Sequence, residues 1–424
     1  MLNKILQIFR IREIRNRLFV IAGVLVVFRF LAAIPVPGVD PAKLQELFSG
    51  NQLLGFLNIF SGGALSNLSI AMLGLGPYIT STIIMQLLTM IFPNLKAMYY
   101  EEGAQGRAKF NRFSRFLTVP LAALQGFGFL KLLQSQQVIQ VSGLLDTFIN
   151  VLTITAGSLI LVWLGEIITE QKLGNGVSIL IFGGIVSGLP GILRNAFVQY
   201  SPDKIPTYAA FIILTFLVIA GIVMVNEGER KIPVSYAKRI RGNRVYGGSS
   251  SYLPLRVNQA GVIPIIFAIS ILLFPQFLGQ IISAFNQPIG EAVSNWVIGV
   301  FNNQLIYGII YFILVFAFTY FYIAVTFDPA EISKNLQRSG GFVPGIRPGE
   351  PTSHFLKSVI SRITLFGASF LGLIAVLPTV VQFLTKTPAL TIGGTAVLIV
   401  VSVALETIKQ IDSQLTAREY DTIQ

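Results

Sequence analysis

Side chains that could carry out chemistry are few in this chain of 424 residues. It contains no Cys, which excludes disulfides, thiolate metal ligands and a thiol nucleophile. The single His, His354, is too little for a multi-histidine metal site or a histidine-based triad. The sequence also lacks a Gly-x-x-x-x-Gly-Lys-Ser/Thr phosphate loop. We therefore expect a protein that is not an enzyme and needs no cofactor.

Polar residues inside the long apolar stretches are the next candidates, because proton relays and ion sites place acidic or His groups near the middle of a membrane. The stretches contain Arg29, Gln86, Gln125, Glu166, Asn258 and Glu406. Both glutamates lie near the end of a stretch, where a structural role is favoured over a proton relay. An intramembrane enzyme would need a Ser/Lys pair, and no stretch offers one at a suitable spacing.

The elements that must hold these residues are apolar. Hydrophobic residues make up 53% of the chain and charged residues 12%, against about 25% charged in soluble domains. A helix needs about 20 apolar residues to cross the hydrocarbon layer. This rule predicts an all-α polytopic membrane protein with ten transmembrane helices. They lie at 18–36, 71–92, 112–134, 146–169, 176–194, 207–226, 258–278, 305–327, 359–384 and 392–411.

Basic residues orient these spans, because Lys and Arg gather in cytoplasmic loops. With residues 1–17 in the cytoplasm, the segments on that side and the span ends that adjoin them, including Arg362, hold 25 of the 31 Lys and Arg residues. Both termini are then cytoplasmic. Ten spans divide into two sets of five in opposite orientations, as in inverted-repeat folds. We expect an N-terminal half at 1–200 and a C-terminal half at 201–424.

The stretch 55–74 is apolar but interrupted by small and polar residues, and it leads into a Gly-Leu-Gly-Pro sequence that must bend or break a helix. Irregular backbone at membrane depth occurs only where it is buried in protein or lines a cavity. The stretch therefore predicts a short re-entrant helix inside a pore. The alternative is an amphipathic helix on the outer membrane interface.

Two cytoplasmic loops, 227–257 and 328–358, are longer than a simple connection requires. In the first, Ile232, Val234 and Tyr236 alternate before an Arg-Gly-Asn turn at 241–243, which predicts a β-hairpin. The second is stiffened by Pro and Gly around Arg347. The number of basic residues by itself would be explained by the need to orient the spans in the membrane. Two structured basic loops on one face indicate a docking platform for a large, anionic partner.

Short motifs along almost the whole chain resemble the SecY family of protein-translocation channels. Their order and their placement relative to ten spans carry the resemblance. They are IPVPG (34–38), NIFSGGALS (58–66), GPYI (76–79), WLGE (163–166), GNG (174–176), LPL (253–255), NQAGVIP (258–264), FVPGIRPGE (342–350) and GGT (393–395).

The resemblance implies two inverted five-helix halves around a central hourglass pore, with a re-entrant plug helix at about 58–70. By spacing alone the aliphatic residues at the pore would be ordinary helix packing. The resemblance assigns a pore ring to Leu75, Ile79, Val177, Ile181, Ile266 and Ile399. It assigns the plug to Asn58, Ile59, Phe60, Ser61, Gly62, Gly63, Ala64, Leu65 and Ser66. Thr80, Gln125 and Asn258 resemble the polar cluster of a lateral gate between spans 2 and 3 and spans 7 and 8.

The implied function is a protein-conducting channel that passes unfolded secretory polypeptides and releases transmembrane segments sideways into lipid. The implied partners are the SecE and SecG subunits, the SecA ATPase motor, the ribosome, signal peptides, nascent polypeptides and membrane lipids. Motor and ribosome would dock on Arg230, Lys238, Arg239, Arg241, Arg244 and Arg347. The implied location is the bacterial plasma (inner) membrane. The alternative from the residues alone is an ion-coupled secondary transporter with inverted repeats, which leaves the long basic loops unexplained.

Overall fold

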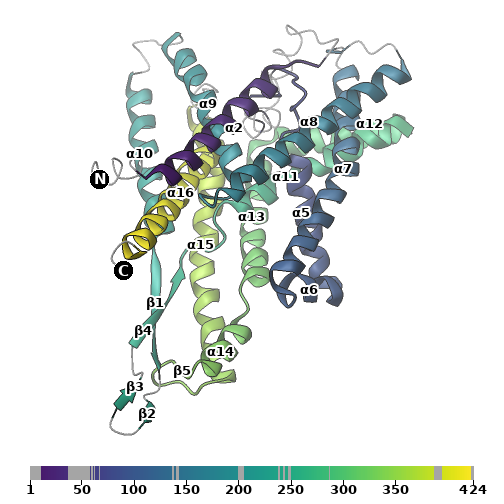
Figure 1. Cartoon of the computed structure of the whole chain (residues 1–424). Helices are drawn as coiled ribbons and strands as arrows, with labels where there is room; N and C mark the ends of the chain where they lie inside the picture. Colours follow the sequence, from purple (N-terminus) through teal and green to yellow (C-terminus); the bar gives the residue numbers. More distant parts are fainter. Residues whose placement is uncertain are drawn as a thin grey trace.

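Helices dominate the computed structural model, and two small sheets project from one end of them (Figure 1). The structure describes residues 11–36, 58, 61, 63–65, 67–135, 138–139, 143–198, 205–236, 239–241, 244–246, 250–285, 287–385 and 394–421. Within these ranges the strands lie between 229 and 256 and at 341–342, and helices account for most of the rest.

Every segment predicted to span the membrane contains a helix. These helices are α2 (Arg12–Ala33), α5 (Gly76–Ile91), α7 (Gly103–Ser135), α8 (Leu144–Glu170), α9 (Gly176–Val198), α10 (Ile205–Glu227), α11 (Ile263–Phe285), α13 (Gln304–Thr326), α15 (Glu350–Thr385) and α16 (Gly394–Asp421). Three shorter helices join them: α6 (Pro93–Tyr100), α12 (Gln287–Asn302) and α14 (Pro329–Arg338). Side chains of Asn303 and Asp328 cap the first turns of α13 and α14.

Length and composition support a membrane protein, but with fewer clear spans than predicted. Among the described residues, 6 helices are long and apolar enough to cross a membrane. Counting the α5–α6 pair, which bends by 112°, as one span gives 7. Proline inside α9 and α11, at Pro190 and Pro275, interrupts the backbone hydrogen bonding of those helices. The ten-span topology therefore stays a prediction.

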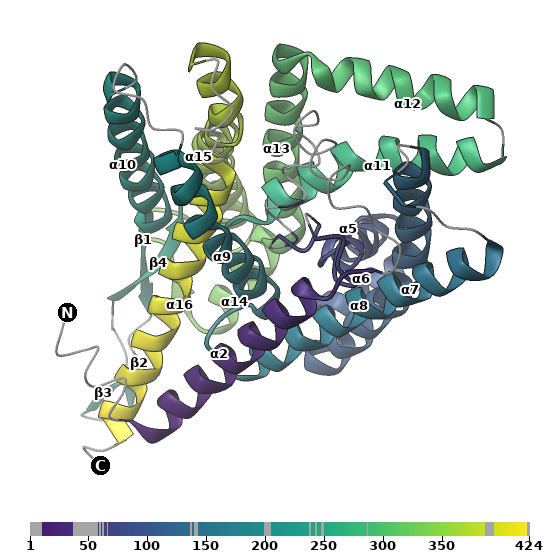
Figure 2. The ribbon, with the colours of Figure 1, turned by 90° about the horizontal axis from the view of Figure 1, so that it is seen from above.

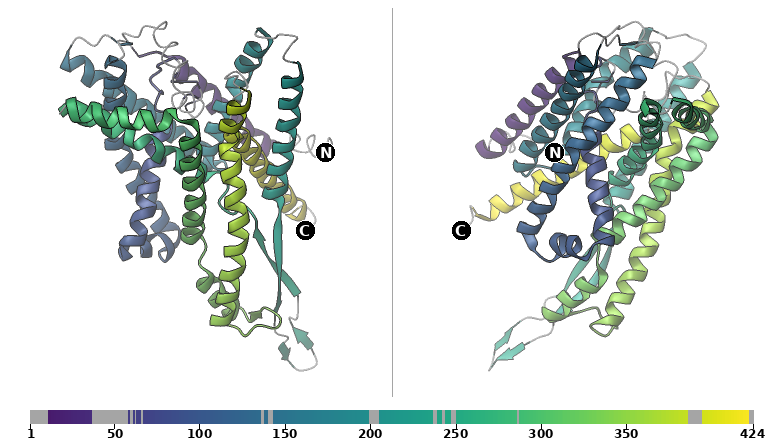
Figure 3. Two further views of the ribbon diagram at one scale, coloured as in Figure 1. Left: turned by 180° about the vertical axis from the view of Figure 1, so that it is seen from behind. Right: turned by 90° about the vertical axis from the view of Figure 1, so that its right-hand side faces the viewer.

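The arrangement of α11 also differs from a simple upright span. Figures 2 and 3 show α11 and α12 side by side, extending outward across the direction of α13. The first part of α11 nevertheless stays at the centre of the molecule, because it packs against α5, α7 and α13. Phe267 in this part lies edge-on to Phe318 of α13, with ring centroids 6.0 Å apart. The N-terminal end of α11 is thus held between both predicted halves.

The sheet confirms the β-hairpin predicted in the first long loop. Its central strand β1 (Glu229–Tyr236) pairs antiparallel with β4 (Ser250–Arg256), with Ile232 opposite Leu253. Beyond β1, a second hairpin of β2 (Arg239–Arg241) and β3 (Arg244–Tyr246) turns where the Arg-Gly-Asn sequence predicted it. The other edge of β1 pairs with β5 (Gly341–Phe342). The two long loops are far apart in the sequence, but they are joined by the pairing of β1 with β5.

The first and last helices meet at one end of the molecule (Figure 2). Arg17 of α2 donates hydrogen bonds to the side chain of Gln414 in α16 (3.1 Å) and to the carbonyl oxygen of Gln171 (3.2 Å). Gln414 in turn donates to the carbonyl oxygen of Lys172 (2.6 Å). Lys172 has φ +58°, so its carbonyl is held in a tight left-handed turn. This network, the α2–α16 strap, joins segments from both predicted halves.

Candidate functional site

The six aliphatic residues predicted to form a pore ring belong to a single apolar cluster at the centre of the molecule. Leu75, Ile181, Ile266 and Ile399 are buried in it, while Ile79 and Val177 are partly buried and pack against it. They come from α5, α9, α11 and α16 and from the residue that precedes α5. The cluster extends well beyond these six residues. The structure thus brings the six together, and their role as a ring stays a prediction.

The start of α9 is positioned by a close contact with α8. A Cβ atom at Gly176 would clash with the carbonyl group of Gly165, so only glycine permits this approach. Thr169 accepts a hydrogen bond from the backbone N–H of Gly176 (2.9 Å) and donates one to the carbonyl oxygen of Gly165 (2.9 Å). This contact fixes where Val177 and Ile181 enter the central cluster.

The predicted plug is partly described. The structure describes Asn58, Ser61, Gly63, Ala64 and Leu65 of it, whereas Ile59, Phe60, Gly62 and Ser66 lie outside the described residues. Asn58 is helical, and Ser61 bonds to it: the Ser61 hydroxyl donates to the Asn58 carbonyl oxygen (3.1 Å) and accepts from the N–H of Leu65 (3.1 Å). Ala64 is buried in the central cluster. Ala64 therefore lies against the same apolar centre as Leu75, whereas Leu65 is buried in a second cluster with Val36 and Phe129.

Residues 67–75, which come after the predicted plug, form successive turns tied to the end of α2. The N–H of Val36 donates to the carbonyl oxygen of Leu68 (2.8 Å), and the N–H of Ile70 donates to that of Ile34 (3.0 Å). Leu68 is buried with a positive φ of 41°. The irregular backbone predicted here is present, and it is buried in protein as its polar groups require.

The three residues predicted for the lateral gate do not share a hydrogen bond within the described ranges. Thr80 donates to the carbonyl oxygen of Gly76 within α5 (3.0 Å), and Gln125 is buried in α7. Asn258, just before α11, donates through Nδ2 to Asn226 Oδ1 (2.8 Å) and to the carbonyl oxygen of Gly261 (3.3 Å). The helices expected to form the gate do touch, since α11 packs against α5 and α7.

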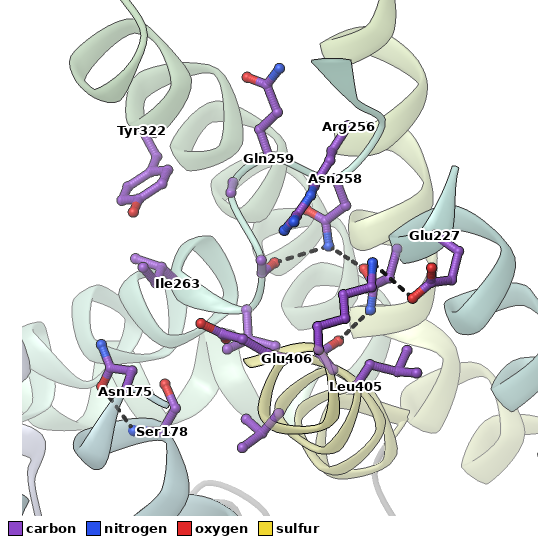
Figure 4. A pocket seen from close by; sticks show the side chains of 17 residues that line it. Asn175, Ser178, Glu227, Arg256, Asn258, Gln259, Ile263, Tyr322, Leu405 and Glu406 are labelled. Carbon is purple, nitrogen blue, oxygen red and sulfur yellow. Dashed lines mark hydrogen bonds and ion pairs between the residues drawn. The ribbon is translucent and has the colours of Figure 1, made fainter. Parts of the chain in front are cut away.

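Asn258 lines a cavity of about 290 Å³ between α9, α10, the β4–α11 connection and α16 (Figure 4). Asn226 links it onward by donating to Ser402 Oγ of α16 (2.7 Å). Because the Gly261 carbonyl can only accept, Asn258 must turn Nδ2 toward it. This orientation leaves its buried Oδ1 without a hydrogen-bond partner among the described residues. The cavity therefore has one unpaired acceptor.

Charged side chains surround the rest of the cavity. Lys409 of α16 and Glu227 at the end of α10 form an ion pair at 2.9 Å, and Arg256 and Glu406 also line the space (Figure 4). Equal numbers of acidic and basic groups make the lining neutral overall. Within the described ranges, no three His, Cys, Asp or Glu side chains lie close enough to hold a metal ion.

The β2–β3 hairpin lies at the far end of the projecting strands (Figure 1). Arg230 instead lies near the start of β1, opposite Leu255 and three residues after Glu227, which lines the cavity. Arg230 on β1 and Arg347 after β5 are exposed. Thr352 holds the Arg347 turn by donating to its carbonyl oxygen (2.8 Å). Arg239, Arg241 and Arg244 lie on the β2–β3 hairpin, and Lys238 lies outside the described residues. The predicted docking residues are thus spread over β1, the separate β2–β3 hairpin and the turn after β5.

Comparison with known proteins identifies the family. The family model described as SecY matches residues 69–408, most of the chain. The chain belongs to the SecY family. The protein translocase subunit SecY of Corynebacterium glutamicum is 40% identical over 451 residues, with 99% of each chain covered. The SecY subunit of Streptomyces coelicolor is 40% identical over 444 residues, again with 99% of each covered.

Solved structures of SecY-type channels share the fold. A structure described as a protein-conducting channel has a TM-score of 0.64 and 21% identity, covering 93% of this chain and 91% of its own. A second, concerned with the plug domain of SecY and the closed state, has a TM-score of 0.63 and 24% identity, covering 92% and 90%. At these identities the likeness shows the fold alone.

The sequence motifs indicate the SecY family, but they do not indicate every residue that holds Asn258 in the cavity. Asn226 and Ser402 hold Asn258, yet neither was predicted to do so. Asn226 is the last residue of the predicted span 207–226, and an amide at the end of an apolar run could have flagged it. Ser402 carries no such signal, because a Ser within a helix usually bonds to its own backbone.

Proposed function

We propose that this chain is a protein-conducting channel, which passes unfolded secretory polypeptides across a membrane and releases transmembrane segments sideways into lipid. The observation that carries the proposal is the family relationship: 40% identity over 99% of the chain to curated protein translocase subunits. The short motifs along the sequence predict the same family independently.

The proposed channel is an hourglass that widens on both sides of a constriction. The constriction is formed by Leu75, Ile79, Val177, Ile181, Ile266 and Ile399. A narrow aliphatic constriction excludes water and ions by dewetting, and it offers no hydrogen bonds to a passing backbone. It therefore seals the membrane without holding its cargo. The proposal is supported by the meeting of these residues in one apolar cluster, although they come from distant parts of the chain.

The lateral gate lies where α5 and α7 meet α11 and α13. An apolar segment that reaches lipid through such a seam stays there, because each buried CH₂ is worth roughly 0.8 kcal/mol. Thr80, Gln125 and Asn258 make the seam less stable than a fully apolar one. The packing of α11 against α5 and α7 supports this placement.

For the topology, we propose ten spans in two inverted halves, 1–200 and 201–424, with both termini in the cytoplasm and the plug at 58–70 on the outer side. A helix in each of the ten predicted segments supports this arrangement. The concentration of 25 of 31 basic residues in the proposed cytoplasmic segments and the span ends that adjoin them supports the orientation. The location is the bacterial plasma (inner) membrane.

The basic residues of the two long loops are the proposed docking site for the SecA motor and the ribosome, which supply the energy that a channel without a nucleotide-binding motif lacks. SecE and SecG complete the complex, and signal peptides, nascent polypeptides and lipids are its ligands. We propose no catalytic step for this chain itself. The ion-coupled transporter is not supported, since the relatives of this chain are translocase subunits.

A stalled secretory substrate tests the proposal. The full chain is reconstituted with its partner subunit and motor, with a photo-crosslinking residue at one position at a time. The substrate should crosslink to positions 79, 181, 266 and 399. Position 374 is the matched control, because Ile374 is buried in the same cluster but belongs to α15 and lies outside the proposed ring. Equal crosslinking at 374, or none at the four ring positions during active translocation, would refute the ring.

A further inference from the structure

Helix α12 stands apart from the helices that make up the proposed channel. It joins α11 to α13 and runs outward from the end of α13, across its direction (Figures 1 and 3). It packs along α11 and buries Gly290 and Val297. The central apolar cluster contains no described residue of α12. This helix therefore lies outside the cluster that holds the proposed pore ring.

The outer face of α12 is apolar and exposed. Ile289 is 55% exposed and Trp296 is 70% exposed, and Ala292 between them is exposed as well. Spacings of three and four residues place the three side chains in one stripe along the helix. An exposed Trp in an apolar stripe needs a cover that removes its ring from water.

The helix that follows α12 also exposes apolar side chains, which face lipid if α13 spans the membrane. Near the start of α13, Leu305 is 63% exposed and Ile309 is 61% exposed. The segment beginning at Gln304 is one of the candidate spans. Helix α12 ends at Asn302, directly before α13, and runs across the direction of α13. If α13 spans the membrane, α12 therefore lies at the level where the N-terminal end of α13 emerges from the hydrocarbon layer. Trp prefers this level, because its ring is apolar and its N–H can reach water or headgroups.

We propose that α12 is an interfacial helix, lying in the headgroup boundary of the leaflet from which the N-terminal end of α13 emerges. Ile289, Ala292 and Trp296 insert toward the acyl chains. The inference goes beyond channel function and rests only on the proposed insertion of α13 in the membrane. An anchor here sets the height of the α11–α13 connection at the bilayer surface.

The chain has only two Trp residues, Trp163 and Trp296, which makes the proposal directly testable by fluorescence. Trp163→Phe leaves Trp296 as the single reporter, and Trp296→Phe leaves Trp163. Trp163 is 61% exposed on α8, inside a candidate span, and so serves as the control for insertion. Each full-length variant is reconstituted into phosphatidylcholine vesicles brominated either near the headgroup or near the end of the acyl chain.

Trp296 should be quenched more by the shallow bromines than by the deep ones, by about twofold or more, because interfacial helices insert only ~5–10 Å. In the Trp163→Phe background, Ile289→Glu should reduce the shallow quenching. Quenching of Trp296 by aqueous iodide but not by bromine, with Trp163 quenched by bromine, would show that the stripe faces water. Protection of Trp296 from both would show that protein covers it. Either result overturns the proposal, and so does stronger quenching of Trp296 by the deep bromines than by the shallow ones. Loss of bromine quenching at both Trp residues would also overturn the insertion of the chain in the membrane.

Discussion

A methyl group at Gly157 is expected to displace the turns that come after the plug. Gly157 of α8 lies against the backbone of Ile70, and a Cβ atom there would be 2.7 Å from the Ile70 carbonyl carbon and closer still to its oxygen. Ordinary contact begins at 3.4 Å. The neighbour is backbone, held by the hydrogen bond from the Ile70 N–H to the Ile34 carbonyl oxygen (3.0 Å), so it cannot rotate away. Gly157→Ala must therefore shift α8 or the turns.

The expected cost is the balance of two opposing terms. Overpacking costs ~1–3 kcal/mol, and the upper end applies because rigid backbone is displaced. Ala in place of Gly within a helix returns ~1 kcal/mol. Gly157→Ala should thus lower the free energy of unfolding by about 2 kcal/mol, roughly a thirtyfold change in the folded-to-unfolded ratio. Because the displaced turns lead into Leu75, the variant should also raise the halide permeability of reconstituted vesicles.

Gly126→Ala is the matched control. Gly126 lies in the neighbouring helix α7, and a Cβ atom there would be 3.5 Å from a methyl group of Ile154 and 3.7 Å from one of Leu73, both ordinary contacts. This variant should be neutral or more stable by up to ~1 kcal/mol, with unchanged permeability. Thermal unfolding in detergent and halide efflux from vesicles measure the two effects. Equal unfolding midpoints and equal permeability for the two variants would refute the steric reasoning.

Three further predictions concern the strap, the cavity and the ring. Gln414→Leu removes the bond to the Lys172 carbonyl and an acceptor on α16, and it should lower stability by ~1–2 kcal/mol, measured by thermal unfolding. Asn226→Ala leaves Asn258 Nδ2 bonded to Gly261 alone and should shift signal-sequence selectivity in a translocation assay, as we expect for Asn258→Leu. Ile399→Ser should raise halide permeability of reconstituted vesicles, because a hydroxyl favours water in the constriction.

Each of these variants has a control in the same region. Ser413→Ala changes an exposed neighbour of Gln414 and should leave the unfolding midpoint unchanged. Gln259→Ala removes another amide from the cavity lining and should leave selectivity unchanged. Ile374→Ser puts a hydroxyl in the same apolar cluster outside the ring and should lower stability without raising permeability. If a control variant gives the same measured change as its test variant, the corresponding prediction is wrong.

Local patterns in the sequence predicted the elements of the fold well. The alternation of Ile232, Val234 and Tyr236 predicted a strand, and the structure confirms it as β1. Because strand and turn signals act between near neighbours, the β2–β3 hairpin was predicted at the correct place as well. The predicted spans each contain a helix, but the interruptions by proline in α9 and α11 and the sideways direction of α11 were not predicted.

The site was predicted only in part, since its members are far apart in the chain. All six proposed ring residues lie in one cluster, yet motif resemblance selected them, because helical periodicity identifies a buried face without identifying its neighbours. Asn258 was expected beside Thr80 and Gln125, whereas its side-chain partner is Asn226. Which amide meets which depends on how the end of α10 lies against the β4–α11 connection and α16.

The sequence by itself determined the solvent and the family of this protein: a charge content of 12% leaves too few charges for a water-exposed surface, and its motifs are those of SecY channels. Only the tertiary structure decided its long-range contacts. Arg17 and Gln414 are 397 positions apart, and nothing near either residue indicates the other. A polar side chain in an apolar environment must find a hydrogen-bond partner, but the partner is set by which helix ends lie within about 3 Å of it.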